Sequence, residues 1–250
     1  GGMPRAWSLD VFGVYARTVE DAGVLLEVIA GESEQDPATY GTPRPTYDRE
    51  PPTDLSGFKI GVPTDEAIFR ADPAVQSVVD AALEELRLLG CEIVEIHLPD
   101  IDTIAALGGT ILLAEAATIH DEWVREIPDQ YAEAVVWRLQ QGHHIPATRY
   151  LQAQRLRPRI TKEFVTSVYD SVDAVLTPTI TMPVLDFETA NSFNSAEASG
   201  EIFETTKCTV WANYLGLPGM SVPCGFTPDG LPVGFQIVAR PFDEAALLAL

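Results

Sequence analysis

Residues 58–97 read FKIGVPTDEAIFRADPAVQSVVDAALEELRLLGCEIVEIH, and this stretch decides the fold. Two short apolar runs, 58–62 and 92–96, flank a segment whose apolar residues recur at helical spacing. Pro73 suits a first helical position and Gly90 a helix end, so a helix is expected from Pro73 to about residue 89. Its apolar face comprises Val75, Val78, Val79, Ala82, Leu83 and Leu86. Two strands joined by one helix predict a parallel βαβ unit in a covered sheet.

The segment before this unit predicts one helix, over 19–30. Thr18 is a good N-cap residue, and Gly31 suits the left-handed position after a helix. The spacing of Leu25, Leu26 and Ile29 predicts that they face the core.

The segment after the unit is expected to be helical over 104–125, 130–141 and 147–169. Pro158 lies within the third range, and we expect it to kink that helix or split it in two. Residues 172–176 then predict a buried strand.

The last part of the chain predicts a helix over 202–214 that Gly216 stops. Strands follow at 220–223 and 233–238. Asp229-Gly230 lies between them and is typical of a hairpin, because glycine accepts a positive φ.

Composition excludes several classes of protein. The chain has 250 residues and is 46% hydrophobic, which is enough to bury a core. Its formal net charge of −21 argues against a nucleic-acid partner and against docking on an anionic membrane. No apolar run is expected to be long enough to span a bilayer. The cysteines are Cys91, Cys208 and Cys224, an odd number without CxxC spacing, so we expect reduced thiols and a cytoplasmic location.

The common motifs of metal, phosphate and nucleophile sites are missing from these 250 residues. No HExxH, GxGxxG or GxSxG pattern occurs. His143 and His144 are adjacent, so on a helix they would diverge. We therefore expect no metal site and no organic cofactor.

Several motifs nevertheless resemble one family in order and approximate spacing. They are Trp7-Ser8-Leu9-Asp10 with Gly13, the segment 16–22 (ARTVEDA), Leu176-Thr177-Pro178-Thr179, the segment 213–225 (NYLGLPGMSVPCG), the segment 231–236 (LPVGFQ) and the segment 240–244 (RPFDE). Together they resemble the amidase signature enzymes, although Val14 stands where that family usually has proline.

The resemblance implies an α/β fold, a central mixed β-sheet covered by helices on both faces. It also implies that residues 1–250 are the C-terminal portion of a single amidase signature domain, an incomplete fragment. Family members use a serine nucleophile, a second serine in a cis peptide and a lysine, all in segments that precede the first motif. Lys59, Lys162 and Lys207 have no Ser/Gly-rich partner segment in this sequence. We therefore expect no catalytic residue in this chain and no activity of the chain alone.

The resemblance also implies a substrate pocket and a set of structural positions. The positions that match the acyl-side pocket are Trp123, Phe203, Thr206 and Val210, and ordinary core packing is the alternative for each. The structural motif residues are Asp10, Thr177, Pro178, Thr179, Asn213, Gly216 and Pro218. Among these, we expect Asp10 to cap its loop and Asn213 to pin its own turn.

Three functions stay open from the sequence. The first is an amidohydrolase that cleaves the C–N bond of a small-molecule amide through an acyl-serine intermediate, as a monomer or a homodimer. The second is the A subunit of a tRNA-dependent glutamine amidotransferase, which Thr206 disfavours because these subunits usually carry aspartate there. The third is a non-catalytic α/β binding module.

Overall fold

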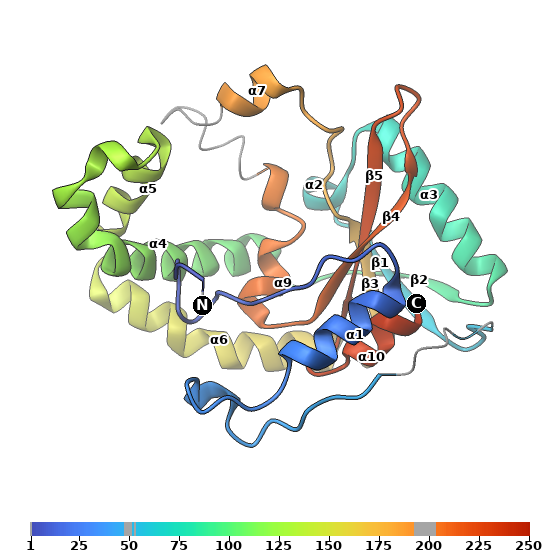
Figure 1. The fold of residues 1–250 in the computed structure, drawn as a ribbon. Coiled ribbons are helices and arrows are strands. Elements are labelled where there is room, and N and C mark those ends of the chain that lie inside the picture. The colour runs from blue at the N-terminus through green and yellow to red at the C-terminus, as the bar shows by residue number, and fades with distance from the viewer. Residues whose placement is uncertain (1, 48–51, 53, 193–203) are drawn as a thin grey trace.

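The computed structural model describes residues 2–47, 52, 54–192 and 204–250, and its centre is one five-stranded sheet (Figure 1). The strands are β1 Lys59–Pro63, β2 Glu92–Ile96, β3 Ala174–Pro178, β4 Gly219–Phe226 and β5 Pro232–Ala239, in the order β2-β1-β3-β5-β4. β1 pairs in parallel with β2 and β3, whereas β5 pairs antiparallel with β3 and β4. The sheet is therefore mixed, as expected.

Helices cover both faces of this sheet. The described helices of six or more residues are α1 Val19–Ile29, α3 Pro73–Leu88, α4 Ile101–Glu126, α5 Glu133–Gly142, α6 Ala147–Val168, α7 Phe187–Ser192, α9 Val210–Leu215 and α10 Glu244–Ala249. Shorter ones are α2 Glu66–Phe69 and the 3₁₀ turns η1 Pro37–Thr39 and η2 Pro128–Gln130. One core lies between the sheet and α4, α6 and α9, and a second lies between the sheet and α3 and α10.

The predicted βαβ unit is confirmed. β1 and β2 are parallel from Lys59 opposite Glu92 onward, and α3 connects them. Asp72 caps α3 by accepting a hydrogen bond from the backbone N–H of Ala74, and Pro73 follows in the first turn. The buried residues of α3 are Val75, Val79, Leu83 and Leu86, all of which belong to the predicted face.

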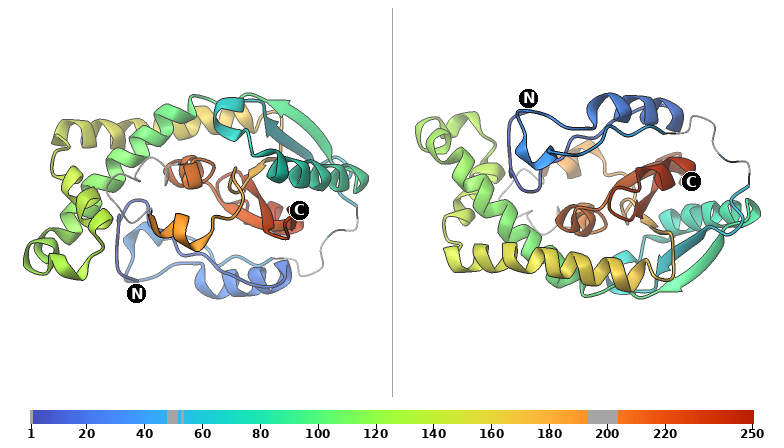
Figure 2. Two further views of the ribbon diagram at one scale, coloured as in Figure 1. Left: turned by 90° about the horizontal axis from the view of Figure 1, so that it is seen from above. Right: turned by 90° about the horizontal axis from the view of Figure 1, so that it is seen from below.

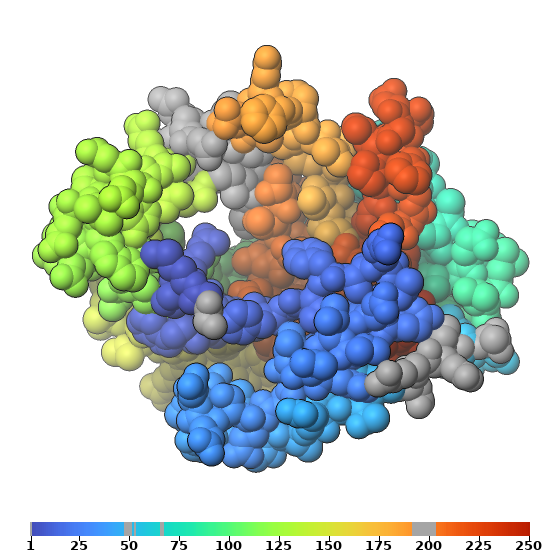
Figure 3. All heavy atoms as spheres, viewed as in Figure 1, coloured from blue at the N-terminus to red at the C-terminus, as the bar shows by residue number. Residues whose placement is uncertain are grey.

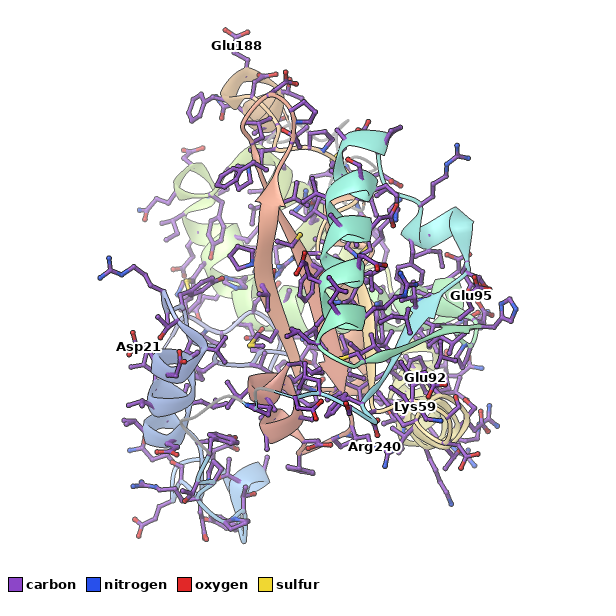
Figure 4. The ribbon with its side chains drawn as sticks, turned by 90° about the vertical axis from the view of Figure 1, so that its right-hand side faces the viewer. Asp21, Lys59, Glu92, Glu95, Glu188 and Arg240 are labelled. Atoms are coloured by element: carbon purple, nitrogen blue, oxygen red, sulfur yellow. The ribbon has the colours of Figure 1, made fainter. Side chains whose placement is uncertain are left out.

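Charged side chains line β2, which is an edge strand. Figure 4 shows Glu92 and Glu95 on β2, with Lys59 of β1 next to Glu92. The Lys59 ammonium lies 3.6 Å from the Glu92 carboxylate, and both side chains are about half exposed. Such a pair adds little to stability, but charge along an edge strand discourages pairing with another chain.

The first core depends on close approach between helices. A Cβ at Gly108 of α4 would lie 3.3 Å from the Cβ of Tyr214 of α9. A Cβ at Gly142, the last residue of α5, would overlap the carbonyl oxygen of Leu113 of α4. Only glycine fits at Gly142, where α5 meets α4, and the close approach at Gly108 brings α9 against α4. Both α5 and α9 are therefore positioned by their contacts with α4.

By length and composition alone, α4 is apolar enough to cross a membrane, so the expectation that no such run exists was wrong. In the fold, α4 packs against α5, α6 and α9, and Ile104 and Ile111 lie in the first core. The core helix of a globular protein passes the same test.

Two predictions about helices held only in part: no split occurs at Pro158, and of the three α1 residues predicted to face the core only Leu26 is half-buried. α6 is not split at Pro158 but runs from Ala147 to Val168. Pro158 lies on its exposed face, where the carbonyl that loses its partner can bond to water. On α1, Leu25 and Ile29 are exposed, and the buried residue is Gly23, where a Cβ would lie 3.4 Å from Leu248 of α10. The apolar face of α1 is therefore largely uncovered in the described part of the chain.

The remaining elements agree with the sequence apart from their bounds. β3 starts two residues later than predicted and includes Thr177 and Pro178, because Pro178 at its end needs no donor toward β1. The helix predicted over 202–214 begins outside the described residues, and α9 starts only at Val210. Gly230 has φ +79° in the β4–β5 hairpin, as predicted.

Candidate functional site

Polar side chains of α4 and α6 hold Ser8, in the segment before α1. The Glu115 carboxylate accepts hydrogen bonds from the backbone N–H of Ser8 at 3.0 Å and from its hydroxyl at 2.7 Å. The hydroxyl of Tyr150 and the amide of Gln154 donate to the same carboxylate, at 2.9 and 3.0 Å. Glu115 has no exposed surface. Its charge is thus balanced by four donors instead of by water, which is the condition for burying a carboxylate.

Arg157 of α6 holds the other side of Ser8. Its guanidinium donates to the carbonyl of Ser8 at 2.7 Å and to the carbonyl of Tyr214. Burial lowers the pKa of the Arg157 guanidinium, whereas Tyr214 and Glu115 raise it in part. Burial, and then the bond to Glu115, raises the pKa of the Tyr150 hydroxyl. The N–H, hydroxyl and carbonyl of Ser8 are therefore all bound by side chains from helices that are distant in sequence.

Asp10 and Asn213 complete the attachment of this segment. The Asp10 carboxylate caps the turn by accepting from the N–H groups of Arg5 and Ala6, at 2.7 and 3.0 Å. The amide of Asn213 donates to the carbonyl of Leu9 at 2.8 Å. Asn213 thus ties α9 to the N-terminal segment and does not pin its own turn, which Gly216 closes with φ +68° and its backbone bonds.

His120, near the end of α4, holds the segment at Pro4. Its Nε2 lies 3.1 Å from the carbonyl oxygen of Pro4, and its Nδ1 lies 2.9 Å from the hydroxyl of Tyr131. A carbonyl can only accept, so Nε2 carries the proton and donates. In neutral His120 the Tyr131 hydroxyl then donates to Nδ1.

A second polar group lies where β3, β4 and β5 meet. The buried Gln236 side chain donates to the carbonyl of Cys208 at 2.9 Å and to the hydroxyl of Thr177 at 3.4 Å. The hydroxyls of Thr179 and Ser221 lie 2.7 Å apart. Gln236 therefore fixes the residues just before α9 against the sheet, and with them the backbone near Thr206. Pro178 is buried in β3, and the carbonyl of Pro218 accepts from the N–H of Ala239.

The structure describes three of the four residues expected in the pocket, and it places them on α4, before α9 and at the start of α9. Trp123 is 40% exposed on α4, with its ring 5.6 Å from that of His120. Thr206 is exposed before α9, Val210 is half-buried at its start, and Phe203 lies outside the described residues. α4 crosses α9 at Gly108, 15 residues or about 22 Å along the helix from Trp123. This crossing therefore does not bring Trp123 to Val210. Figure 3 shows the surface hollowed between the N-terminal segment and α5.

The lysines and cysteines show what chemistry these residues can perform. Lys59 and Lys207 form ion pairs with Glu92 and Glu204, and Lys162 is exposed on α6. Burial raises the pKa of the Cys208 thiol to about 12, so its nucleophilic thiolate is scarce near neutral pH. Among the described residues, no group of three His, Cys, Asp or Glu side chains could hold a metal ion.

Glu115 and Arg157 were not among the residues expected from the motifs, although one signal was present. Glu115 stands within Ile111-Leu112-Leu113-Ala114-Glu115-Ala116-Ala117, where an apolar helix face has no reason to carry a carboxylate unless partners wait for it. The partners come from residue 8 and from α6, and only the folded chain brings these together.

Comparison with known proteins identifies the family. The family model described as Amidase matches residues 1–248. An amidase of Pseudomonas putida is 35% identical over 249 residues, which cover 99% of this chain and 53% of that protein. The A subunit of the glutamyl-tRNA(Gln) amidotransferase of Myxococcus xanthus is also 35% identical, over 100% of this chain and 55% of its own length.

Solved structures agree with this result. A crystal structure of an amidase has a TM-score of 0.80 at 25% identity and covers 98% of this chain and 52% of its own. The A subunit of the glutamyl-tRNA(Gln) amidotransferase from Thermotoga maritima has a TM-score of 0.77 at 27% identity. The chain spans about half the length of the relatives it matches. With the family model covering nearly all of its residues, this chain belongs to the amidase family.

Proposed function

We propose that this chain is the C-terminal part of an amidohydrolase that cleaves the C–N bond of a small-molecule carboxylic amide. The observation that carries the proposal is the match of the Amidase family model to residues 1–248, joined by an amidase relative at 35% identity. We further propose that residues 1–250 form part of a single domain whose serine nucleophile, second serine and lysine precede residue 1.

The chemistry of amides supports this division of roles. An amide carbonyl is a poor electrophile, so the attacking serine must lose its proton as it attacks. Attack gives a tetrahedral oxyanion that backbone N–H groups stabilise, and collapse releases the amine and leaves an acyl-serine. Water then attacks the acyl-serine and frees the acid. These steps need no metal or organic cofactor. The part proposed for this chain is to hold the acyl group, with Trp123, Phe203, Thr206 and Val210 as pocket residues.

A second candidate function has its own support. The Myxococcus xanthus relative, the A subunit of a glutamyl-tRNA(Gln) amidotransferase, is as similar to this chain as the Pseudomonas putida amidase. In that case the product ammonia would be transferred within a complex of subunits. Thr206 argues against this candidate, because a hydroxyl cannot form the ion pair that an aspartate forms with a charged amino-acid group. We propose a cytoplasmic location from the three free cysteines, and a homodimer remains an alternative to a monomer.

The test is to express the whole gene product that contains this chain and to assay it on a panel of aliphatic and aryl amides. We expect release of ammonia or amine, labelling of one serine by a fluorophosphonate, and neither from the 250-residue chain alone. Thr206→Val is expected to change the ratio of KM values between two amide substrates more than Thr166→Val, a matched change of an exposed threonine on α6.

Other results would separate the alternatives. Hydrolysis of glutamine alone, with ammonia passed to a copurifying subunit, would favour the amidotransferase. Turnover by the 250-residue chain that a substitution within it abolishes would show that the catalytic groups are in this chain and that their proposed place is wrong.

A further inference from the structure

The segment that Glu115 and Arg157 hold is attached on one side only. Its inward residues are small or polar apart from Leu9: Ala6 has no exposed surface, and Ser8 carries the hydrogen bonds. Its outward residues are large and apolar: Trp7, Val11, Phe12 and Tyr15 are 57%, 81%, 78% and 99% exposed. A segment that only covered its own core would have the opposite pattern, with the bulky side chains inward.

The free-energy cost of burying the groups that bind Ser8 also indicates that the outward side chains of this segment have a partner. Burying a carboxylate and half-burying a guanidinium is unfavourable unless every donor and acceptor is matched. Here that arrangement immobilises three polar groups of one serine, Ser8, and its consequence is that Trp7 and its neighbours are held outward. We call Trp7, Val11, Phe12 and Tyr15 the outer strip.

α1 follows the outer strip along the chain and lies on the opposite side of the molecule from α6 (Figure 2). Leu25, Val28 and Ile29 of α1 are also exposed. Figure 3 shows the N-terminal segment and α1 together over the front of the molecule. Several large apolar side chains exposed on two consecutive segments are typical of a contact surface.

We propose that the outer strip is the surface on which the preceding part of the same amidase domain packs, with apolar side chains of its own. The relatives are nearly twice as long as this chain, so a domain of their size has about as much chain again to place. Glu115 and Arg157 act as positioning residues that hold the strip at the junction. This inference rests on the proposed function for the existence of that preceding part.

The charge of the chain disfavours a second copy as the occupant. The net charge is −21, so two copies repel each other as they approach. A preceding part of the same polypeptide is held at the strip by its covalent link and needs no such encounter.

The test compares hydroxyl-radical labelling of the outer strip in the 250-residue chain and in the whole gene product. We expect labelling of Trp7, Phe12 and Tyr15 to fall about tenfold in the whole protein, as exposed side chains become the centre of an interface. Phe12→Asp in the whole protein is expected to lower its thermal midpoint more than Tyr40→Asp, a matched change of another exposed aromatic.

The other outcomes overturn either this proposal or the proposed function, and they can be told apart. Equal labelling in both proteins would show that the strip stays in water. Protection that appears in the chain alone and grows with its concentration would assign the strip to a second copy. Amide hydrolysis by a whole protein with an unprotected strip would remove this inference and leave the proposed function, whereas protection in a protein inactive on amides would do the reverse.

Discussion

α3 and α1 carry apolar faces of similar helical spacing, yet only one of the faces is buried. On α3, Val75 and Val79 are at most 2% exposed, because they pack against the sheet in the second core. On α1, Leu25 and Ile29 are 43% and 51% exposed, and the buried residue is Gly23. Helical spacing thus tells which face of a helix has to be covered, and it does not tell what covers that face.

The comparison predicts the largest difference for polar substitutions on the two faces. Val79→Asn is expected to lower the free energy of unfolding by about 3 kcal/mol, because it buries an amide without partners and loses packing. Val28→Asn, on the exposed face of α1, is expected to change it by less than about 0.5 kcal/mol in this chain. Urea unfolding of the 250-residue chain measures both. Equal losses would mean that α1 is covered within the chain itself.

A smaller loss in the free energy of unfolding is expected for a substitution at Glu115, on the buried face of α4. A substitution on the exposed face of the same helix provides the comparison. Glu115→Gln is expected to cost about 2 kcal/mol, because one amide nitrogen must then face a donor, either the N–H of Ser8 or the amide of Gln154. Hydrogen exchange at Ser8 and Leu9 should rise as the segment loosens.

The matched control is Glu122→Gln, an exposed carboxylate on the same helix. It should change neither the free energy of unfolding nor the exchange by a measurable amount. Unchanged exchange at Ser8 in Glu115→Gln would show that the carboxylate does not hold the segment.

The smallest effect near neutral pH is expected for the reaction of the buried thiols with a disulfide reagent. With the pKa of Cys208 raised to about 12, roughly one thiol in 10⁴ is ionised at pH 8, so a disulfide reagent should reach it only on unfolding. Cys224 is less buried and should react first. Fast reaction of Cys208 in the folded chain would contradict its burial.

The same pKa gives a dependence on alkaline pH. The unfolded thiol ionises near pH 8.5, so the contribution of Cys208 to stability is complete below about that pH. It is lost as the pH rises toward about 12, by up to about 1.4 kcal/mol per pH unit. Cys208→Ala should lack this part of the slope, which urea unfolding at pH 8 to 10 measures.

Much of the fold followed from local pattern, and the site did not. Alternation, helical spacing and cap residues predicted the βαβ unit and the hairpin at Gly230, because these signals act within a few residues. The pocket residues stay a proposal, and Glu115 was missed because its partners lie 107 and 35 positions away, at Ser8 and Tyr150. The split that was one expected outcome at Pro158 does not occur for a related reason: the exposed position of Pro158, which no local pattern gives, makes a proline tolerable within the helix.

The sequence by itself determined the family, the mixed sheet between helices and the helical register of α3, since all of these depend on side chains read in order along the chain. Only the tertiary structure decided that Ser8 is bound on three polar groups by α4 and α6, that Asn213 reaches Leu9, and that the apolar face of α1 is left exposed in this chain. The physical reason is that burial and hydrogen bonding depend on which residues distant in sequence meet in the fold. A local pattern along the chain contains only one residue of each such contacting pair.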